Sequence, residues 1–270
     1  LCSFFLFILR ELKTQNPIVD LRIFANRNFL ICTILVFIWG IIIFATQYIL
    51  PVFIARTRGL DGTTIASMVY IMGAAQVASG FLALFLFKVV NRRTVAFIGF
   101  IMLATGTWLQ GFMISEIGLN EIIWPQIIRG LSAQLCFLPL VLLSIGYLPA
   151  DKIKDGSGLY SLMNRLGAAI GIAASNTLFE LKITENYLEI SNITSKVLYQ
   201  SQLFLTKLNN LIPKYLSNSP EKIKIASEIL YKIGIEEASA MAFNQIMLIM
   251  GIMALVISPL IFFVKGLKKE

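Results

Sequence analysis

The chain alternates between long apolar stretches and short polar loops. Six stretches of roughly twenty mostly apolar residues can be followed along its 270 residues. A helix needs about 20 residues to cross a hydrocarbon core of about 30 Å, so we predict that each stretch is a transmembrane helix. The predicted spans are residues 29–50, 64–87, 95–115, 122–147, 159–180 and 241–264. The predicted fold class is an all-α membrane protein built as a six-transmembrane-helix bundle.

The segments outside the spans complete the predicted organisation. Residues 1–12 are apolar at first but too short to cross a bilayer, and we expect them to be the end of a preceding transmembrane helix. Residues 13–28 are predicted to form a cytoplasmic linker, 29–181 to hold spans one to five, and 182–240 to form a long extracytoplasmic loop with amphipathic helices. In that loop we expect one helix to start at Pro220 and to end at Gly234. Residues 241–264 are the last span and 265–270 a cytoplasmic tail.

Composition and charge agree with a membrane protein. Hydrophobic residues make up 57% of the chain and charged residues 14%, whereas roughly a quarter of the residues are charged in a globular domain. The net charge of +8 does not indicate nucleic-acid binding, because the basic residues lie between the spans and do not gather with aromatic residues on one polar face. The lipid bilayer is the expected partner.

The basic residues also predict an orientation. On one side of the short loops lie Arg10, Lys13, Arg22, Arg27, Lys88, Arg92, Arg93, Lys152, Lys154, Lys265, Lys268 and Lys269. The other side of the short loops holds only Arg56 and Arg58. Positive residues favour the cytoplasmic side, so we predict a multi-pass protein of the cell (inner) membrane with both termini cytoplasmic.

The residue types needed for common enzyme chemistry are scarce. The chain contains no histidine, which excludes Ser-His-Asp catalysis and His-ligated metals. The cysteines Cys2, Cys32 and Cys136 are scattered in or beside apolar stretches and indicate small hydrophobic residues, not a disulfide framework. A membrane-embedded enzyme would need catalytic acids or metal ligands near the interface, and none is visible. We therefore expect no enzyme activity, no metal and no cofactor.

Several short motifs carry a family resemblance. In chain order they are Asn16-Pro17-Ile18-Val19-Asp20-Leu21, Asn26-Arg27-Asn28-Phe29, Tyr48-Ile49-Leu50-Pro51, Trp124-Pro125-Gln126, Arg129-Gly130, Phe137-Leu138-Pro139-Leu140 and Asn164-Arg165-Leu166-Gly167-Ala168-Ala169-Ile170-Gly171. Their order and spacing resemble the C-terminal six-helix half of the EmrB/QacA-type drug:proton antiporters of the major facilitator superfamily, which have fourteen spans. The resemblance covers essentially the whole chain.

Two departures from that family are visible. The loop after the second predicted span lacks the acidic residue usual there and keeps only the basic pair Arg92-Arg93. In the fifth span the family tends to Arg-x-Leu-Gly, whereas here Arg165 directly precedes Leu166-Gly167. A conformational latch at the loop, and a role carried over to Arg165, therefore do not follow from the resemblance.

The resemblance implies a transmembrane transporter. The function implied is multidrug or small-molecule efflux by proton antiport with alternating access, with the proton gradient as energy source and this chain as one half. No Asp or Glu lies in the interior of the six predicted spans, so the proton-carrying acid would come from the N-terminal half of the same transporter or from a second chain. The alternative is an inactive or partner-dependent half-transporter, a truncated or split gene product that acts only as a membrane scaffold.

Aromatic rings and neutral amides inside the spans are the candidate substrate contacts. The predicted substrate-binding residues are Trp39, Phe44, Gln47, Gln76, Gln126, Arg129, Asn176 and Asn244. Such a lining suits amphipathic or cationic small molecules. For most of these residues an interhelical hydrogen bond or a lipid-facing ring is the competing interpretation. We expect Gln126 and Arg129 to face a central cavity, and snorkelling of Arg129 to the interface is its alternative.

Small residues predict where helices touch. Gly167 and Gly171 form a Gly-x-x-x-Gly motif in the fifth predicted span, and Gly73 and Gly80 lie seven residues apart in the second. Small side chains let two helix backbones approach closely in a membrane. We therefore predict that both pairs pack against neighbouring helices.

Overall fold

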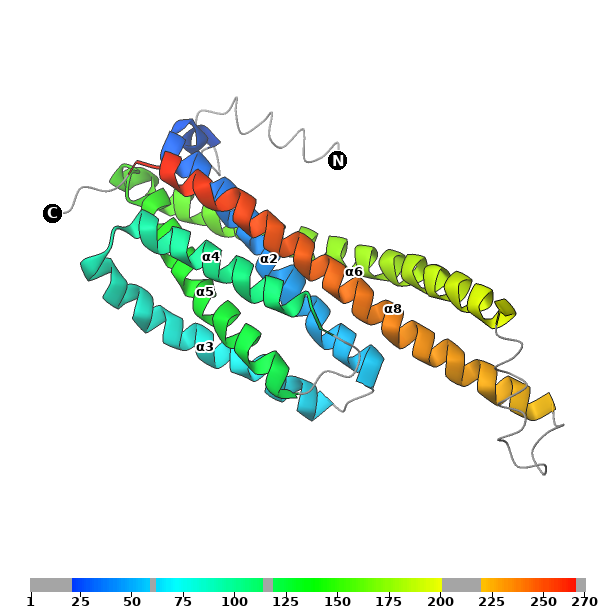
Figure 1. The fold of residues 1–270 in the computed structure, drawn as a ribbon. Coiled ribbons are helices and arrows are strands. Elements are labelled where there is room, and N and C mark those ends of the chain that lie inside the picture. Colours follow the sequence, from blue (N-terminus) through cyan, green and yellow to red (C-terminus); the bar gives the residue numbers. More distant parts are fainter. Residues whose placement is uncertain (1–20, 59–61, 114–118, 201–219, 266–270) are drawn as a thin grey trace.

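The regular structure is entirely helical in the part of the chain that the structure describes. The structure is a computed structural model, and it describes residues 21–58, 62–113, 119–200 and 220–265. Its elements are the 3-10 helix η1 (Leu21–Ala25), α2 (Arg27–Arg58), α3 (Gly62–Val89), α4 (Arg92–Gln110), α5 (Leu119–Ile145), η2 (Ala150–Lys152), α6 (Ile153–Gln200), α8 (Pro220–Ile257) and η4 (Ser258–Phe263) (Figure 1). The predicted all-α membrane class is confirmed.

Five helical segments within the described residues are long and apolar enough to cross a membrane. They are Arg27–Thr57, Ile65–Val89, Glu121–Ile145, Ala150–Asn192 and Tyr231–Phe263. The third predicted span, 95–115, falls on α4, which is not one of the five. This helix has only 19 residues, and the polar residues Arg92, Arg93 and Gln110 at its two ends lower its mean hydropathy. The count of six spans stays a prediction.

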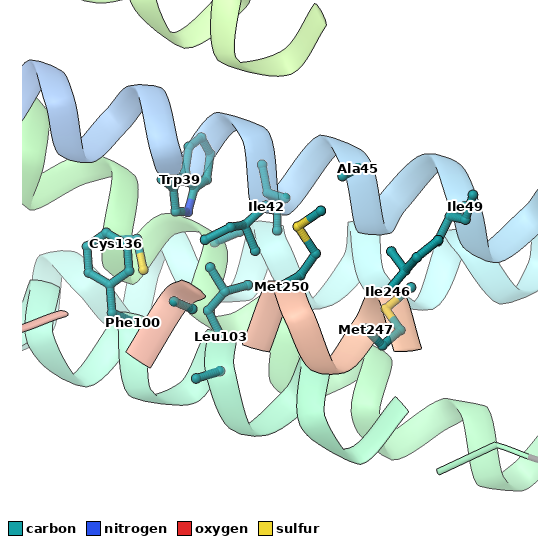
Figure 2. Close-up of a cluster of buried hydrophobic side chains, with 14 of the residues drawn as sticks. Trp39, Ile42, Ala45, Ile49, Phe100, Leu103, Cys136, Ile246, Met247 and Met250 are labelled. Atoms are coloured by element: carbon teal, nitrogen blue, oxygen red, sulfur yellow. The ribbon is translucent and has the colours of Figure 1, made fainter. Parts of the chain in front are cut away.

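The helices form one bundle with α2 and α5 in its interior. Helix α2 packs against α6, α5 and α8, while α5 packs against α4, α3 and α2. Helices α3 and α6 lie at the edges, and their membrane-spanning windows are only 22% and 28% buried, compared with 61% for α2. The core between α2, α4, α5 and α8 is apolar, as shown by Ile42, Leu103 and Met250 in Figure 2. The two edge helices therefore offer most of their surface to lipid or to another protein segment.

Glycines set the close approach of α2 and α6. A Cβ atom added to Gly167 would lie 2.2 Å from the carbonyl oxygen of Phe37, and one added to Gly171 would lie 2.4 Å from that of Ile41. From the other side, a Cβ on Gly40 would lie 2.8 Å from the carbonyl oxygen of Asn164. The backbones thus meet without intervening side chains, as the Gly-x-x-x-Gly motif predicts.

The second pair of glycines behaves differently. A Cβ atom on Gly73 or Gly80 would meet nothing within 4 Å. The prediction that this pair packs against a neighbouring helix is therefore wrong within the described chain. The physical reason is that α3 contacts α5 through another face, where Gly130 of α5 lies against the backbone of Met72 and Ser79 donates to the carbonyl oxygen of Leu131.

The segment predicted as an extracytoplasmic loop, 182–240, consists largely of helix extensions. Helix α6 continues to Gln200 and α8 starts at Pro220, as predicted for its first turn, so both helices project beyond the rest of the bundle (Figure 1). The predicted helix end at Gly234 is wrong. Gly234 is buried inside α8, and a Cβ atom there would lie 3.0 Å from the ring of Tyr187 on α6. This glycine makes room for a ring and does not end a helix.

Two asparagines tie the chain together at the start of α2. The Asn26 carboxamide oxygen accepts the backbone N–H groups of Asn28 and Phe29 at 3.0 and 3.3 Å, which caps the helix. The buried Asn28 side chain donates to the carbonyl oxygen of Lys265 at 3.2 Å and accepts the Lys265 N–H at 2.9 Å. One amide thereby joins the first membrane helix to the segment that follows the last.

Replacing Asn28 by alanine is expected to lower the free energy of unfolding by about 1–2 kcal/mol, because both backbone groups of Lys265 lose their partner. Thermal unfolding of the purified protein in detergent measures this loss. Asn91→Ala is the matched control, since Asn91 stands at the start of α4, is exposed and makes no side-chain capping bond. Equal midpoints for the two variants would contradict the expectation.

Candidate functional site

A polar cluster lies inside the apolar bundle. It consists of Thr46 on α2, Gln110 on α4, and Gln126 and Arg129 on α5, and we refer to it as the Arg129 cluster. Arg129 Nη1 donates to Gln110 Oε1 at 2.6 Å and to Gln126 Oε1 at 3.1 Å, and Arg129 Nη2 donates to Thr46 Oγ1 at 2.5 Å. Gln110 Nε2 also donates to Gln126 Oε1 at 3.3 Å. One guanidinium thereby joins three helices.

The local sequence explains how a long cation fits there. Gln126 and Arg129 are three residues apart, so both side chains leave the same face of α5. On the facing helix α4, a Cβ atom at Gly106 would lie 2.8 Å from Arg129 Cγ, so the glycine leaves space for the aliphatic part of the side chain. The side chain of Arg129 is 0% exposed.

The charge of Arg129 is met by neutral oxygens. Ion pairs among the described residues join Arg56 to Glu180, Lys182 to Glu185 and Lys232 to Glu236, and none of those pairs includes Arg129. Its Nε atom is buried and has no hydrogen-bond partner. Arginine stays protonated in proteins, so this group cannot carry a proton through the membrane. The arrangement can hold helices together but cannot perform acid–base chemistry.

The structure places Gln126 and Arg129 away from any open surface. Gln126 is 1% exposed and Arg129 is fully buried. We expected both to face a central cavity, and their positions between α2, α4 and α5 correct that expectation. As described, neither side chain is accessible to a molecule outside the bundle. Their contact with substrate stays a prediction that needs a rearrangement of these helices.

Two further candidates, Trp39 and Asn244, make contacts inside the bundle. Trp39 is 4% exposed, and its ring centroid lies 5.3 Å from that of Phe137, within the core that Figure 2 shows. Asn244 Nδ2 donates to the carbonyl oxygen of Met113 at 2.6 Å, and Asn244 Oδ1 accepts the Met113 N–H at 3.0 Å. The Asn244 amide therefore fixes the segment after α4 to α8.

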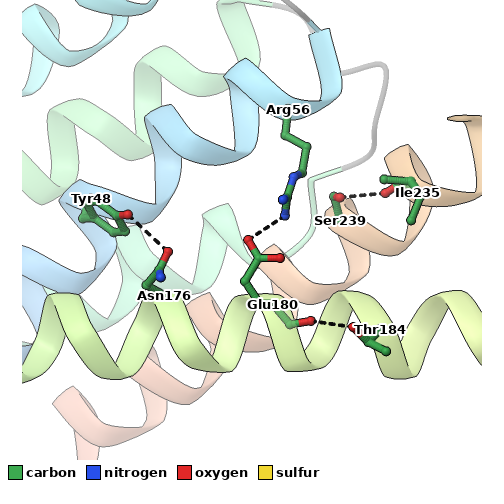
Figure 3. A network of polar contacts seen from close by, with 7 residues as sticks. All are labelled: Tyr48, Arg56, Asn176, Glu180, Thr184, Ile235 and Ser239. Carbon is green, nitrogen blue, oxygen red and sulfur yellow. Dashed lines mark hydrogen bonds and ion pairs between the residues drawn. The ribbon is translucent and has the colours of Figure 1, made fainter.

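The remaining candidates keep part of their side chains accessible. Phe44, Gln47, Gln76 and Asn176 are all half-buried. Asn176 on α6 accepts a hydrogen bond from the Tyr48 hydroxyl on α2 at 3.1 Å (Figure 3). Tyr48 and Asn176 thus belong to the seam between α2 and α6. Phe44 and Gln47 lie on α2, whereas Gln76 lies on the edge helix α3. The structure brings only part of the predicted set together.

The same seam carries an ion pair further along the helices. Arg56 Nη1 lies 2.9 Å from Glu180 Oε1 (Figure 3). The Arg56 guanidinium carbon also lies 5.8 Å from the centroid of the Phe179 ring. Both charged side chains are partly exposed to solvent, which weakens the pair. Neither partner was among the predicted site residues, because Arg56 lies in a predicted loop and Glu180 at the end of a predicted span.

Arg165 has a different environment from Arg129. Its side chain is exposed on α6, and none of the hydrogen bonds or ion pairs of the described residues involves it. Of the two arginines predicted to lie inside spans, Arg129 is fully buried and Arg165 is exposed.

Comparison with known proteins identifies a family and several relatives of the chain. The family model described as "Major Facilitator Superfamily" matches residues 6–172. The chain is 27% identical over 265 residues to the colistin resistance protein EmrB of Acinetobacter baumannii, which covers 98% of this chain and 51% of that protein. It is 25% identical over 206 residues to the multidrug export protein EmrB of Escherichia coli, covering 76% of this chain and 40% of that protein.

A third relative has a different printed function. The chain is 26% identical over 182 residues to the fatty acid resistance protein FarB of Neisseria gonorrhoeae, covering 64% of this chain and 34% of that protein. The chain therefore spans about half of the length of these curated relatives, or less. In the alignment with the Acinetobacter baumannii protein, the similarity covers nearly all residues of this chain but only part of the relative.

Proposed function

The chain belongs to the major facilitator superfamily, and from this membership we propose that it forms the C-terminal half of a multidrug efflux transporter that works by proton antiport with alternating access. The observation that carries the proposal is the alignment of 98% of the chain with about half of an EmrB protein. Relatives named for colistin resistance, multidrug export and fatty acid resistance support an export role and a broad range of substrates. The family is a transporter family and not a class of enzymes.

The proposal assigns proton coupling to another part of the transporter. A coupling group must load and release a proton inside the membrane, which requires a titratable residue such as Asp or Glu. The described carboxylates nearest to the apolar stretches are Glu121 at the start of α5 and Glu180, which is paired with Arg56. The N-terminal half of the transporter, or a second chain, then supplies the coupling acid. The energy source is the proton gradient, and no cofactor is needed.

The substrate surface in this proposal includes the half-buried residues of α2, α3 and α6. Phe44, Gln47, Gln76 and Asn176 combine one aromatic ring with neutral amides, which suits amphipathic or cationic small molecules of varied shape. The edge helices α3 and α6, being the least buried, offer the surface on which a second half packs. The protein works in the cell (inner) membrane with both termini cytoplasmic.

Expression of the complete gene product in an efflux-deficient bacterium is expected to lower the cellular accumulation of ethidium, and a protonophore is expected to restore it, because export draws on the proton gradient. Fluorescence of ethidium in intact cells measures both effects. A protein that is present in the membrane but leaves accumulation unchanged for every dye and drug tested would favour the alternative, a half-transporter acting as a scaffold.

A further inference from the structure

The segment before α2 folds back onto one end of the bundle. Ile23 of the 3-10 helix η1 is 3% exposed and lies in one apolar cluster with Phe29 at the start of α2 and Leu159 near the start of α6. Phe24 and Leu148 pack against the same cluster, and the rings of Phe24 and Phe29 meet edge to face with their centroids 5.4 Å apart. The short helix η1 therefore covers apolar side chains of two long helices with a buried side chain of its own.

Two side-chain amides fix the chain next to this cluster. Asn26 Nδ2 donates to the carbonyl oxygen of Tyr147, in the turn that follows α5, at 3.4 Å. The Asn28 amide bonds both backbone groups of Lys265, in the segment that follows η4, at 3.2 and 2.9 Å. We refer to residues 21–28 as the 21–28 strap. It connects α2 with α6, with the turn after α5 and with the segment after η4.

All of these contacts lie within this chain. Alternating access rocks one half of a transporter against the other about a site near the middle of the membrane. Such a movement breaks and forms contacts between the halves, whereas contacts inside one half can persist. The 21–28 strap can therefore move as one body with α2, α6 and the segment after η4.

We infer that the 21–28 strap stays docked through the whole transport cycle and shields the adjoining ends of α2 and α6 from water at the predicted cytoplasmic face. Ile23 is the strap residue that closes the cluster, because Phe29 and Leu159, which pack with it, are 0% and 4% exposed. The inference goes beyond the proposed function, since it requires two halves that move but no particular substrate or coupling ion.

The test measures how fast a membrane-impermeant maleimide labels Leu159→Cys from the cytoplasmic side, in the complete transporter without its other cysteines. We expect slow labelling in the resting protein, with ethidium added, and under a proton gradient. Ile23→Asp should speed labelling at least about tenfold, because burial of an isoleucine contributes that factor to a docking equilibrium. Gly158→Cys is the reference for free access, since Gly158 is exposed and a Cβ atom there meets nothing within 4 Å.

Ala25→Asp is the matched control, because Ala25 is an exposed residue of the same 3-10 helix. It adds the same charge and should leave the labelling of Leu159→Cys slow. Labelling as fast as that of Gly158→Cys in any of the three conditions would show that the strap leaves the bundle and would overturn the inference. Labelling that stays slow in Ile23→Asp would show that other parts of the protein shield Leu159, which also overturns it.

A cross-link tests the same inference through transport and in a strap without an added charge. A short bifunctional thiol reagent should join Ile23→Cys to Leu159→Cys, and the cross-linked transporter should export ethidium as fast as the same variant before cross-linking. Export that stops only on cross-linking would mean that the strap has to undock, and the inference fails while the transport function stands. If the protein exports nothing but Leu159→Cys is protected as expected, the export function fails and the docked strap stands.

Discussion

Replacing Arg129 by alanine is expected to destabilise the helix bundle by about 2–4 kcal/mol, because hydrogen bonds to a buried charged group contribute more than neutral ones and a cavity remains. The variant removes the bonds from Arg129 to Thr46, Gln110 and Gln126. The lower part of that range applies if the unfolded chain in the membrane finds other partners for these groups. Insertion into the membrane should persist, since the apolar stretches are unchanged.

Thermal unfolding in detergent measures the loss of stability in Arg129→Ala, and an export assay in cells measures its effect on transport. Arg165→Ala is the matched control, since Arg165 is an arginine of the neighbouring span with an exposed side chain. We expect a lower unfolding midpoint for Arg129→Ala and an unchanged one for Arg165→Ala. An Arg129→Ala protein that unfolds like the wild type and still loses export would instead support direct substrate contact by Arg129.

Arg129→Met separates charge from volume. Methionine keeps much of the aliphatic part that lies beside Gly106 and removes the donors. Gln110 and Gln126 can retain the bond between their own amides, so this variant should lie between the wild type and Arg129→Ala in stability. A midpoint equal to that of the wild type would mean that the guanidinium bonds contribute nothing net.

The hydrophobic pattern predicted the helices well because each span is a local property of the sequence. It did not predict where the long helices end outside the apolar stretches. Gly234 has the sequence features of a helix end, yet a tertiary contact with Tyr187 explains it. Helix α6 likewise continues past Glu180 and Lys182 to Gln200, since charged residues are compatible with a helix that leaves the bundle.

The candidate site was harder to predict because its contacts join distant helices. Gln126 and Arg129 could be placed on one face from their spacing, but Thr46, which accepts a hydrogen bond from Arg129, lies on α2 and has no sequence signal beyond its own residue type. The same holds for Asn244, whose partner is a backbone segment 131 positions away. Residue type and depth in a span suggested substrate contact, which stays a prediction, whereas the tertiary hydrogen bonds of Gln126 and Asn244 could not be read from the sequence.

The glycines show what spacing can and cannot decide. Gly167 and Gly171 lie four residues apart and pack against α2, while Gly73 and Gly80 lie seven apart and face open space. Both spacings place two small residues on one helix face. Whether a neighbouring backbone lies over that face depends on the arrangement of helices, which the spacing alone does not contain.

Substituting alanine at Gly167 and Gly171 together is expected to separate α2 from α6 and to cost more stability than any single change at the surface. Each new Cβ would lie 2.2 or 2.4 Å from a backbone carbonyl oxygen, of Phe37 and Ile41 respectively, and a backbone cannot rotate away as a side chain can. Overpacking of a close contact typically costs about 1–3 kcal/mol per site, so the free energy of unfolding of the double variant should fall by about 2–6 kcal/mol.

Gly158→Ala on the same helix supplies the opposite case. A Cβ atom there meets nothing within 4 Å, and alanine has a higher helix propensity than glycine by about 1 kcal/mol, so this variant should be as stable as the wild type or more stable. Unfolding midpoints in detergent should therefore move in opposite directions for the two variants. Because Tyr48 and Asn176 bond across the same seam, a separated α2 and α6 should also lose that contact and with it export. A double variant that unfolds at the wild-type midpoint would show that the two backbones do not meet at these glycines.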